Sequence, residues 1–117
     1  MTVTQALETS EAQQVAPSAV VWIDRGRSTV VAMSGDRGLS TCEISRGSLS
    51  EPSYLAQVVR VIGDRQRVAI LGPSSVRLAL EREYVALYQR PDRLVDVELS
   101  GPVSTAELVD RVRMLAA

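Results

Sequence analysis

The feature that most constrains the fold is the run at residues 67–75, Arg-Val-Ala-Ile-Leu-Gly-Pro-Ser-Ser, followed by an apolar-periodic stretch. Four unbroken apolar residues, with β-branched side chains at Val68 and Ile70, are typical of a strand buried on both faces. Pro73 ends that strand, because proline has no amide hydrogen for a sheet ladder. Either of the two serines that close the run can cap a helix by accepting N–H groups of its first turn. The run therefore predicts a strand–turn–helix joint at the centre of an α/β fold.

Composition excludes several classes of chemistry. The chain has 117 residues, 45% of them apolar, which fits one ordinary domain with one core. It has no histidine and one cysteine, Cys42. A Ser-His-Asp or Cys-His nucleophile, an internal disulfide, and a histidine or thiolate zinc site are therefore excluded. Cys42 lies in an alternating stretch and is interpreted as a small packing residue. We expect no cofactor and no metal.

Charge and hydropathy give further expectations. The net charge is −1, so no overall field attracts nucleic acid or anionic lipid, and any such contact needs a local patch. All 13 basic residues are arginine, whose planar guanidinium binds phosphate in a bidentate manner. The sequence contains no secretory or membrane-spanning pattern, so we expect a cytoplasmic protein without membrane contact.

The chain divides into a tail and one domain. Residues 1–17 predict a flexible tail, and residues 18–117 predict an α/β domain. The element order is β-β-β-α-β-α-β-α, with strands at 18–24, 28–33, 39–45, 67–71 and 94–99, and helices at 52–62, from 76 to before Pro91, and after Ser104. Ser104 and Glu107 have the spacing of a capping box.

Apolar spacing predicts the buried face of each helix. The residues concerned recur three and four positions apart. They are Leu55, Val58, Val59 and Ile62 in the first helix, Val76, Leu80, Tyr84 and Leu87 in the second, and Leu108, Val109, Val112 and Leu115 in the third.

The right-handedness of crossover connections narrows the topology. Strands four and five, each reached through a helix, are expected to run parallel to strand one. The first three strands form an antiparallel meander, which gives a five-stranded mixed sheet of order 3-2-1-4-5 with strand two antiparallel. Strands one, three, four and five then end at the same edge, and ligand crevices in open α/β sheets form where the strand order reverses.

That edge is the predicted binding site. Arg25, Arg27, Arg46 and Arg77 are expected to gather there beside the first turns of two helices, whose free N–H groups favour anions. The arrangement predicts binding of phosphate, most simply the phosphates of RNA. The residues assigned to it are Arg25, Arg27, Arg46, Gly47, Gly72, Ser74, Ser75 and Arg77.

Two segments and the element order resemble a known family. Residues 19–24 (Ala-Val-Val-Trp-Ile-Asp) and 69–75 (Ala-Ile-Leu-Gly-Pro-Ser-Ser) resemble the middle domain of archaeal and eukaryotic peptide-chain release factors and of Pelota. These segments look closer still to the short single-domain bacterial relatives of that domain. The resemblance covers residues 18–117 and implies a ribonuclease-H-like fold.

The sequence also departs from the family pattern. Release factors carry a Gly-Gly-Gln loop after the third strand, where the glutamine helps water attack peptidyl-tRNA. The matching loop at residues 45–49 is Ser-Arg-Gly-Ser-Leu, and the histidine-rich loops and flanking domains of relatives are missing. The resemblance therefore implies a non-enzymatic binding module of translation that contacts the ribosome or tRNA without hydrolysing peptidyl-tRNA.

Three alternatives stay open. A metal-dependent nuclease of the same fold would use Asp24 at the end of strand one, with Glu43, Asp96 or Glu98, although a strand-end aspartate more often forms a turn. A small-ligand or nucleotide-binding regulatory domain would hold an anion at residues 72–75, although that turn lacks the spaced glycines and lysine of a phosphate loop. Edge strands three and five, or the last helix, could also make a homodimer.

Overall fold

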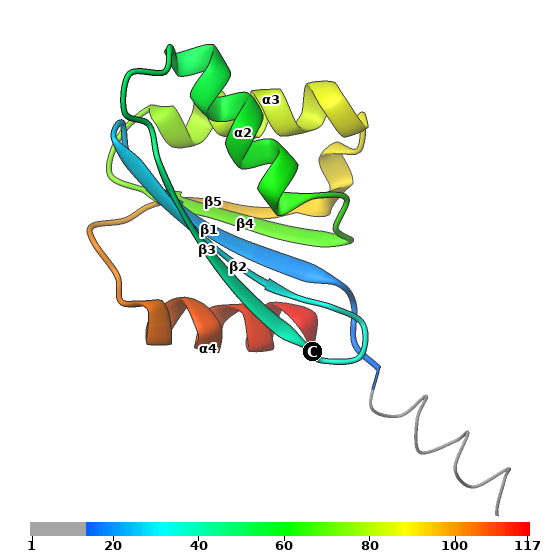
Figure 1. Ribbon diagram of the computed structural model, residues 1–117. Helices are drawn as coiled ribbons and strands as arrows, with labels where there is room; N and C mark the ends of the chain where they lie inside the picture. Colours follow the sequence, from blue (N-terminus) through cyan, green and yellow to red (C-terminus); the bar gives the residue numbers. More distant parts are fainter. Residues whose placement is uncertain (1–13) are drawn as a thin grey trace, which may run out of the picture.

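A computed structural model describes residues 14–117, which form five strands and three α-helices arranged in three layers (Figure 1). The elements are β1 (Ser18–Ile23), β2 (Arg27–Met33), β3 (Leu39–Ser45), α2 (Glu51–Ile62), β4 (Arg67–Gly72), α3 (Val76–Tyr88), the short 3₁₀ turn η1 (Pro91–Arg93), β5 (Leu94–Leu99) and α4 (Thr105–Ala116). No helix within the described range combines the length and the apolar character needed to cross a bilayer. The expectation for residues 1–13 lies outside the described residues.

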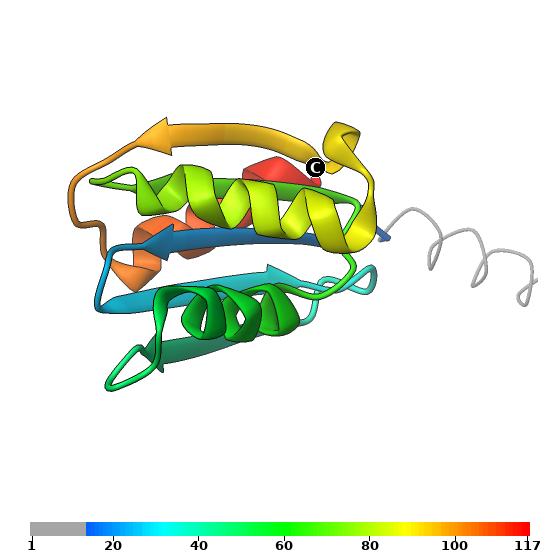
Figure 2. The ribbon, with the colours of Figure 1, turned by 90° about the horizontal axis from the view of Figure 1, so that it is seen from above.

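The predicted sheet is confirmed. Its order is β3-β2-β1-β4-β5, with β2 antiparallel to β1 and β3, and with β4 and β5 parallel to β1. Figure 2 shows the strands side by side beneath α2 and α3, with α4 behind them. The α/β order and the strand directions agree with those predicted from crossover handedness.

Both faces of the central strands are buried. In β1, Ala19, Val21 and Ile23 point towards α2 and α3, while Val20 and Trp22 point towards α4. The apolar run of β4 divides in the same way, and all its residues from Val68 to Leu71 are at most 3% exposed. Central parallel strands covered on both sides need continuous apolar sequence, and this is why the run at 67–75 predicted the fold.

Two residues that were expected to be buried are exposed. Leu87 is 58% exposed, because Tyr88 takes its place in the core, with its ring 4.8 Å from that of Tyr84. The buried stripe of α3 thus continues by steps of four rather than turning to Leu87. Cys42 is also exposed: β3 is an edge strand in which Ile44 is the one buried residue.

Gly72 allows β4 to approach the end of β1. A Cβ atom built on Gly72 would lie 2.2 Å from the carbonyl oxygen of Ile23, and this neighbour is backbone that cannot rotate away. The Gly72 carbonyl also accepts a hydrogen bond of 2.9 Å from the Ser100 amide, which holds the chain leaving β5. Packing therefore explains this glycine without any ligand.

The start of β4 joins the two ends of the described chain. The Pro17 carbonyl accepts hydrogen bonds from the amides of Gln66 and Arg67. The Arg67 guanidinium donates to the carbonyl oxygens of Leu115 and Ala117, both at 2.8 Å. Because the last carbonyls of a helix have no intrahelical donors, Arg67 satisfies part of the carboxyl end of α4.

Arg111 attaches α4 to β5. A bulge at Val95 lets both Leu94 and Val97 pack towards α3, and it places Asp96 and Glu98 on the α4 side. Arg111 forms ion pairs with Glu98 and, at 3.8 Å, with Asp96. The Arg111 guanidinium lowers the pKa of Glu98, whereas the adjacent Glu98 raises the pKa of Asp96.

Arg111→Gln tests the contribution of this ion pair. Because the pKa of Glu98 is lower in the folded state than in the unfolded state, its carboxylate stabilises the fold at pH values above the unfolded-state pKa. This stabilisation is lost as the pH falls and Glu98 becomes protonated. We expect the variant to be less stable than the unmodified chain at pH 7 by about 0.2–1 kcal/mol, since the pair is partly exposed. In urea titrations this difference should shrink below about pH 4. A constant difference across the acid range would contradict the assignment.

Gly72→Ala tests the close approach. We expect a loss of about 1–3 kcal/mol in the free energy of unfolding, because the methyl group would displace the end of β1 from β4. Gly101→Ala is the matched control, since a Cβ there meets no atom within 4 Å. Thermal denaturation should show a lower midpoint for Gly72→Ala alone; equal midpoints would remove the packing explanation.

Candidate functional site

The edge where β1, β3, β4 and β5 end, here called the carboxyl edge, collects the predicted site residues. It comprises the β1–β2 turn at 24–26, the β3–α2 loop at 46–50, the β4–α3 turn at 73–75 and the β5–α4 loop at 100–104. The amino-terminal ends of α2, α3 and α4 follow three of these connections. The predicted meeting of the four connections at one edge is therefore observed.

Asp24 shapes the turn at the centre of this edge. Its Oδ1 atom accepts hydrogen bonds from the amides of Gly26 and Arg27, both at 2.8 Å. Its own amide donates to the Arg27 carbonyl, and its carbonyl accepts from the Tyr54 hydroxyl of α2 at 3.2 Å. Burial raises the pKa of Tyr54, which keeps this donor protonated. Asp24 thus acts as a turn former, as strand-end aspartates commonly do.

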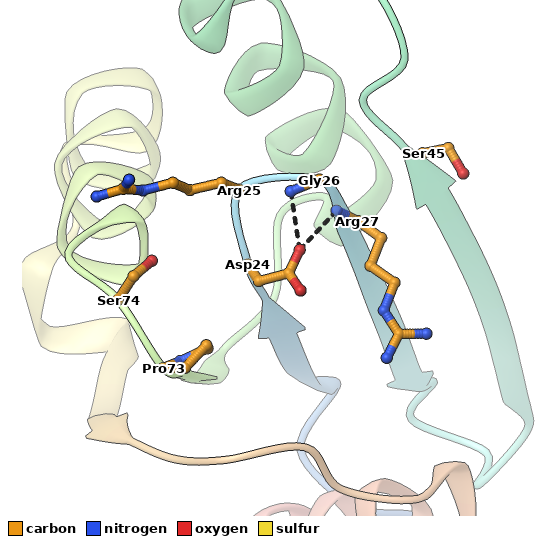
Figure 3. Close-up of a pocket in the computed structure, with 7 residues that line it drawn as sticks. All are labelled: Asp24, Arg25, Gly26, Arg27, Ser45, Pro73 and Ser74. Atoms are coloured by element: carbon orange, nitrogen blue, oxygen red, sulfur yellow. Dashed lines mark hydrogen bonds between the residues drawn. The ribbon is translucent and has the colours of Figure 1, made fainter.

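An open hollow of about 700 Å³ lies between this turn and the β4–α3 turn. It occupies the ends of β1 and β4, where the strand order reverses. The residues that line it are Asp24, Arg25, Gly26, Arg27, Ser45, Pro73 and Ser74 (Figure 3).

The side chains of Arg25 and Arg27 diverge. In Figure 3, Arg25 extends towards the first turn of α3 and Ser74, and Arg27 extends away from it along β2. The Arg27 guanidinium lies 5.3 Å from the centre of the Trp22 ring, on the α4 side of the sheet. Within residues 14–117, the Arg25 guanidinium has no hydrogen bond or ion pair and remains available to a ligand.

Arg46 holds the loop that follows β3. Its Nε atom donates to the Leu49 carbonyl at 2.9 Å, and its guanidinium reaches the Arg25 carbonyl at 3.3 Å. Gly47 has φ of 56°, a left-handed conformation that glycine adopts without strain. The Leu49 amide closes the turn on the Arg46 carbonyl at 3.0 Å. The loop is therefore a tight turn that leads directly into α2.

The β4–α3 turn is held by its own side chains. The Ser74 hydroxyl accepts from the Val76 amide at 3.4 Å, and the Ser75 side chain makes no cap hydrogen bond. Ser74 is thus the serine that contributes a side-chain bond to the start of α3. The Arg77 guanidinium donates to the Ser74 carbonyl at 2.7 Å, and its buried Nε atom has no partner within the described residues.

The acidic residues considered for metal binding are dispersed. Asp24 holds the β1–β2 turn, and Glu43 lies on edge strand β3 opposite Thr29 of β2. Asp96 and Glu98 form ion pairs with Arg111. The described part of the chain contains no group of three metal-ligating side chains. The residues present therefore do not assemble a two-metal centre of the nuclease type.

Sequence reasoning did not foresee the role of Trp22. Its indole Nε1 donates to the Gly101 carbonyl at 3.0 Å, which ties the β5–α4 loop to the end of β1. The same ring carries the Arg27 guanidinium. Strand alternation together with the β1–β2 register places Trp22 and Arg27 on the α4 face. The acceptor Gly101 lies in the β5–α4 loop, whose position strand alternation does not predict.

The fold of this chain is shared with a segment of archaeal Pelota. The structure of this chain matches crystal structures of Pelota from two archaea over most of its length. The match to Archaeoglobus fulgidus Pelota covers 96% of this chain and 35% of that one, with a TM-score of 0.64 and 11% identity. The match to Thermoplasma acidophilum Pelota covers 89% and 34%, with a TM-score of 0.60 and 20% identity.

At these identities the likeness establishes the fold alone. The chain spans about a third of the length of the Pelota chains that it matches. No protein-family model matches the sequence, and no curated protein matches it.

Substitutions at Asp24 distinguish a turn former from a metal ligand. Asp24→Ala should lower the free energy of unfolding by about 1–2 kcal/mol, because two amides lose their acceptor. Asp24→Asn retains an acceptor oxygen and should cost less than Asp24→Ala. Thermal midpoints with and without Mg²⁺ should coincide for the unmodified chain. A rise of the midpoint with Mg²⁺ that Asp24→Asn abolishes would reverse the assignment.

Proposed function

We propose that this protein is a non-catalytic binding module of translation, which contacts the ribosome or tRNA through RNA phosphates at the carboxyl edge. The fold shared with a segment of Pelota, together with the release-factor resemblance of residues 18–117, supports the association with translation. The observation that carries the choice of surface is the Arg25 guanidinium beside the start of α3, which has no hydrogen bond or ion pair within residues 14–117.

The chemistry of the edge suits phosphate. Arg25 supplies an exposed positive charge, and Ser74 supplies a hydroxyl at the amino-terminal end of α3, where the helix dipole favours anions. Arg46 and Arg77 remain charged while they bind backbone carbonyls, so they add a positive field without needing to move. Arg27 extends the basic surface to the other side of the sheet. In this proposal Gly47, Gly72 and Ser75 shape the backbone around the anion.

Hydrolysis of peptidyl-tRNA is not part of the proposal. The loop at residues 46–50 is a tight turn that contains no glutamine and enters α2 directly. No group of three metal-ligating side chains occurs among the described residues, so nothing there supports nuclease chemistry. The module would act in the cytoplasm as a ligand of an RNA-containing assembly.

Arg25→Gln tests the proposal. Binding of purified ribosomes and of tRNA should weaken as salt rises, because each phosphate contact releases counterions. The variant should bind less tightly at low salt, and the slope of log affinity against log salt should fall by about one. Co-sedimentation and filter binding measure these quantities.

Arg60→Gln is the matched control. Arg60 lies in the last turn of α2, away from the carboxyl edge, and the substitution removes the same charge from an exposed site. We expect it to retain the affinity and salt slope of the unmodified chain. Absence of binding to ribosomes and tRNA at every salt concentration would overturn the proposed function, and an equal effect of both variants would overturn the choice of surface.

A further inference from the structure

A second surface lies between β5 and α4, separate from the hollow at the β1–β2 turn. Here called the β5–α4 groove, it encloses about 330 Å³ and is lined by Leu71, Glu98, Ser100, Val103, Glu107, Leu108, Asp110, Arg111 and Met114. Figure 1 shows α2 and α3 on one side of the sheet and α4 on the other. The contacts of α4 fall mainly on β1 and β2, which leaves the β5 side of this face open.

The floor of the groove is apolar. Leu71 and Leu108 belong to the core beneath α4, and Val103 packs partly against it. Met114 stands at the rim and is 75% exposed. A flexible thioether side chain at the edge of an apolar hollow adapts to different partner shapes. The volume accommodates one or two aliphatic side chains.

The rim is acidic. Asp96, Glu98, Glu107 and Asp110 lie in or beside the groove, and Arg111 is the one basic residue that lines it in the described chain. Arg111 is already bound by Glu98 and Asp96. Within this rim, the neighbouring Glu98 carboxylate raises the pKa of Asp96.

Two of these carboxylates have no partner within residues 14–117. The Ser104 hydroxyl accepts the Glu107 amide at 3.1 Å, as a capping box requires, but the Glu107 carboxylate does not return the bond. The Asp110 carboxylate likewise forms no ion pair or hydrogen bond there. Both negative charges are therefore free beside an open apolar floor.

We propose that the β5–α4 groove docks a basic segment of a protein partner. An aliphatic side chain of the partner packs on Leu108 and Met114, while its Lys or Arg residues pair with Glu107 and Asp110. RNA is disfavoured here, because its phosphates would face the carboxylates. This inference does not depend on the function proposed for the carboxyl edge.

A second copy of this chain fits the groove less well. In an isologous dimer the same patch meets itself across a two-fold axis. The acidic rim of one copy would then lie against the acidic rim of the other, and such like-charge contacts oppose association. Charge complementarity therefore favours a different, basic occupant.

The test uses the full chain, labelled with ¹⁵N and titrated with short synthetic peptides. The probe peptide contains Arg and Leu residues; one control peptide replaces Arg by Glu, and another replaces Leu by Ser. We expect the Arg-Leu peptide to shift the amide signals of residues 96–114 selectively, with both control peptides binding more weakly.

Variants separate the groove from general electrostatics. The double variant Glu107→Gln with Asp110→Asn should weaken binding of the Arg-Leu peptide about five- to tenfold, as expected for two exposed charge pairs. Met114→Ser should weaken it without altering net charge. Glu43→Gln, on the distant strand β3, removes one negative charge and should leave affinity unchanged. The retained amide spectrum of each variant verifies folding.

Several results would overturn the proposal. If the control peptide with Ser in place of Leu bound as tightly as the Arg-Leu peptide, the binding would be nonspecific charge attraction. Shifts outside the groove, or a loss in Glu43→Gln equal to that of the double variant, would assign binding elsewhere. Concentration-dependent shifts at residues 96–114 without peptide would identify a second copy as the occupant. Shifts there on adding an RNA oligonucleotide would identify an anionic ligand instead.

Discussion

The burial of β1 on both faces is the constraint on which the rest of the structure depends. Its side chains alternate between two cores, so helices must cover both sides of the sheet. Parallel pairing with β4 then requires crossover helices, and their right-handedness fixes the order of the remaining strands. The close packing of Gly72 against Ile23 brings the ends of β1 and β4 together, and it is there that the hollow of the carboxyl edge forms.

Most of the fold could be predicted from the sequence. The spacing of apolar residues is a local property that identifies strands and helices, and the handedness of crossover connections follows a general rule that orders the strands. The same reasoning failed at Leu87, where the buried stripe of α3 passes to Tyr88, and at Cys42, whose edge strand receives little cover. Periodicity alone does not predict that these two residues are exposed. Their exposure depends on where the neighbouring helices end and on how far those helices extend across the sheet.

The candidate site was predictable at the level of backbone and not at the level of side chains. Topology brings four connections to one edge, whichever rotamers their residues adopt. The direction of Arg27 depends on its pairing with the Trp22 ring, and the carbonyl partners of Arg46 and Arg77 depend on loop conformation. The bulge at Val95 turns Asp96 and Glu98 towards Arg111. This bulge cannot be recognised from the alternating sequence of β5.

The bonds around Arg67 have a consequence for the covalent path of the chain. The Ala16 amide donates to the Ala116 carbonyl at 3.3 Å, and Arg67 binds the end of α4 beside Pro17. Entry to and exit from the described unit are therefore neighbours at one pole of the molecule. A longer polypeptide could enter and leave the domain at this pole without crossing the sheet. A domain of this architecture can therefore be inserted into a longer protein, or be joined to other domains, without distorting its fold.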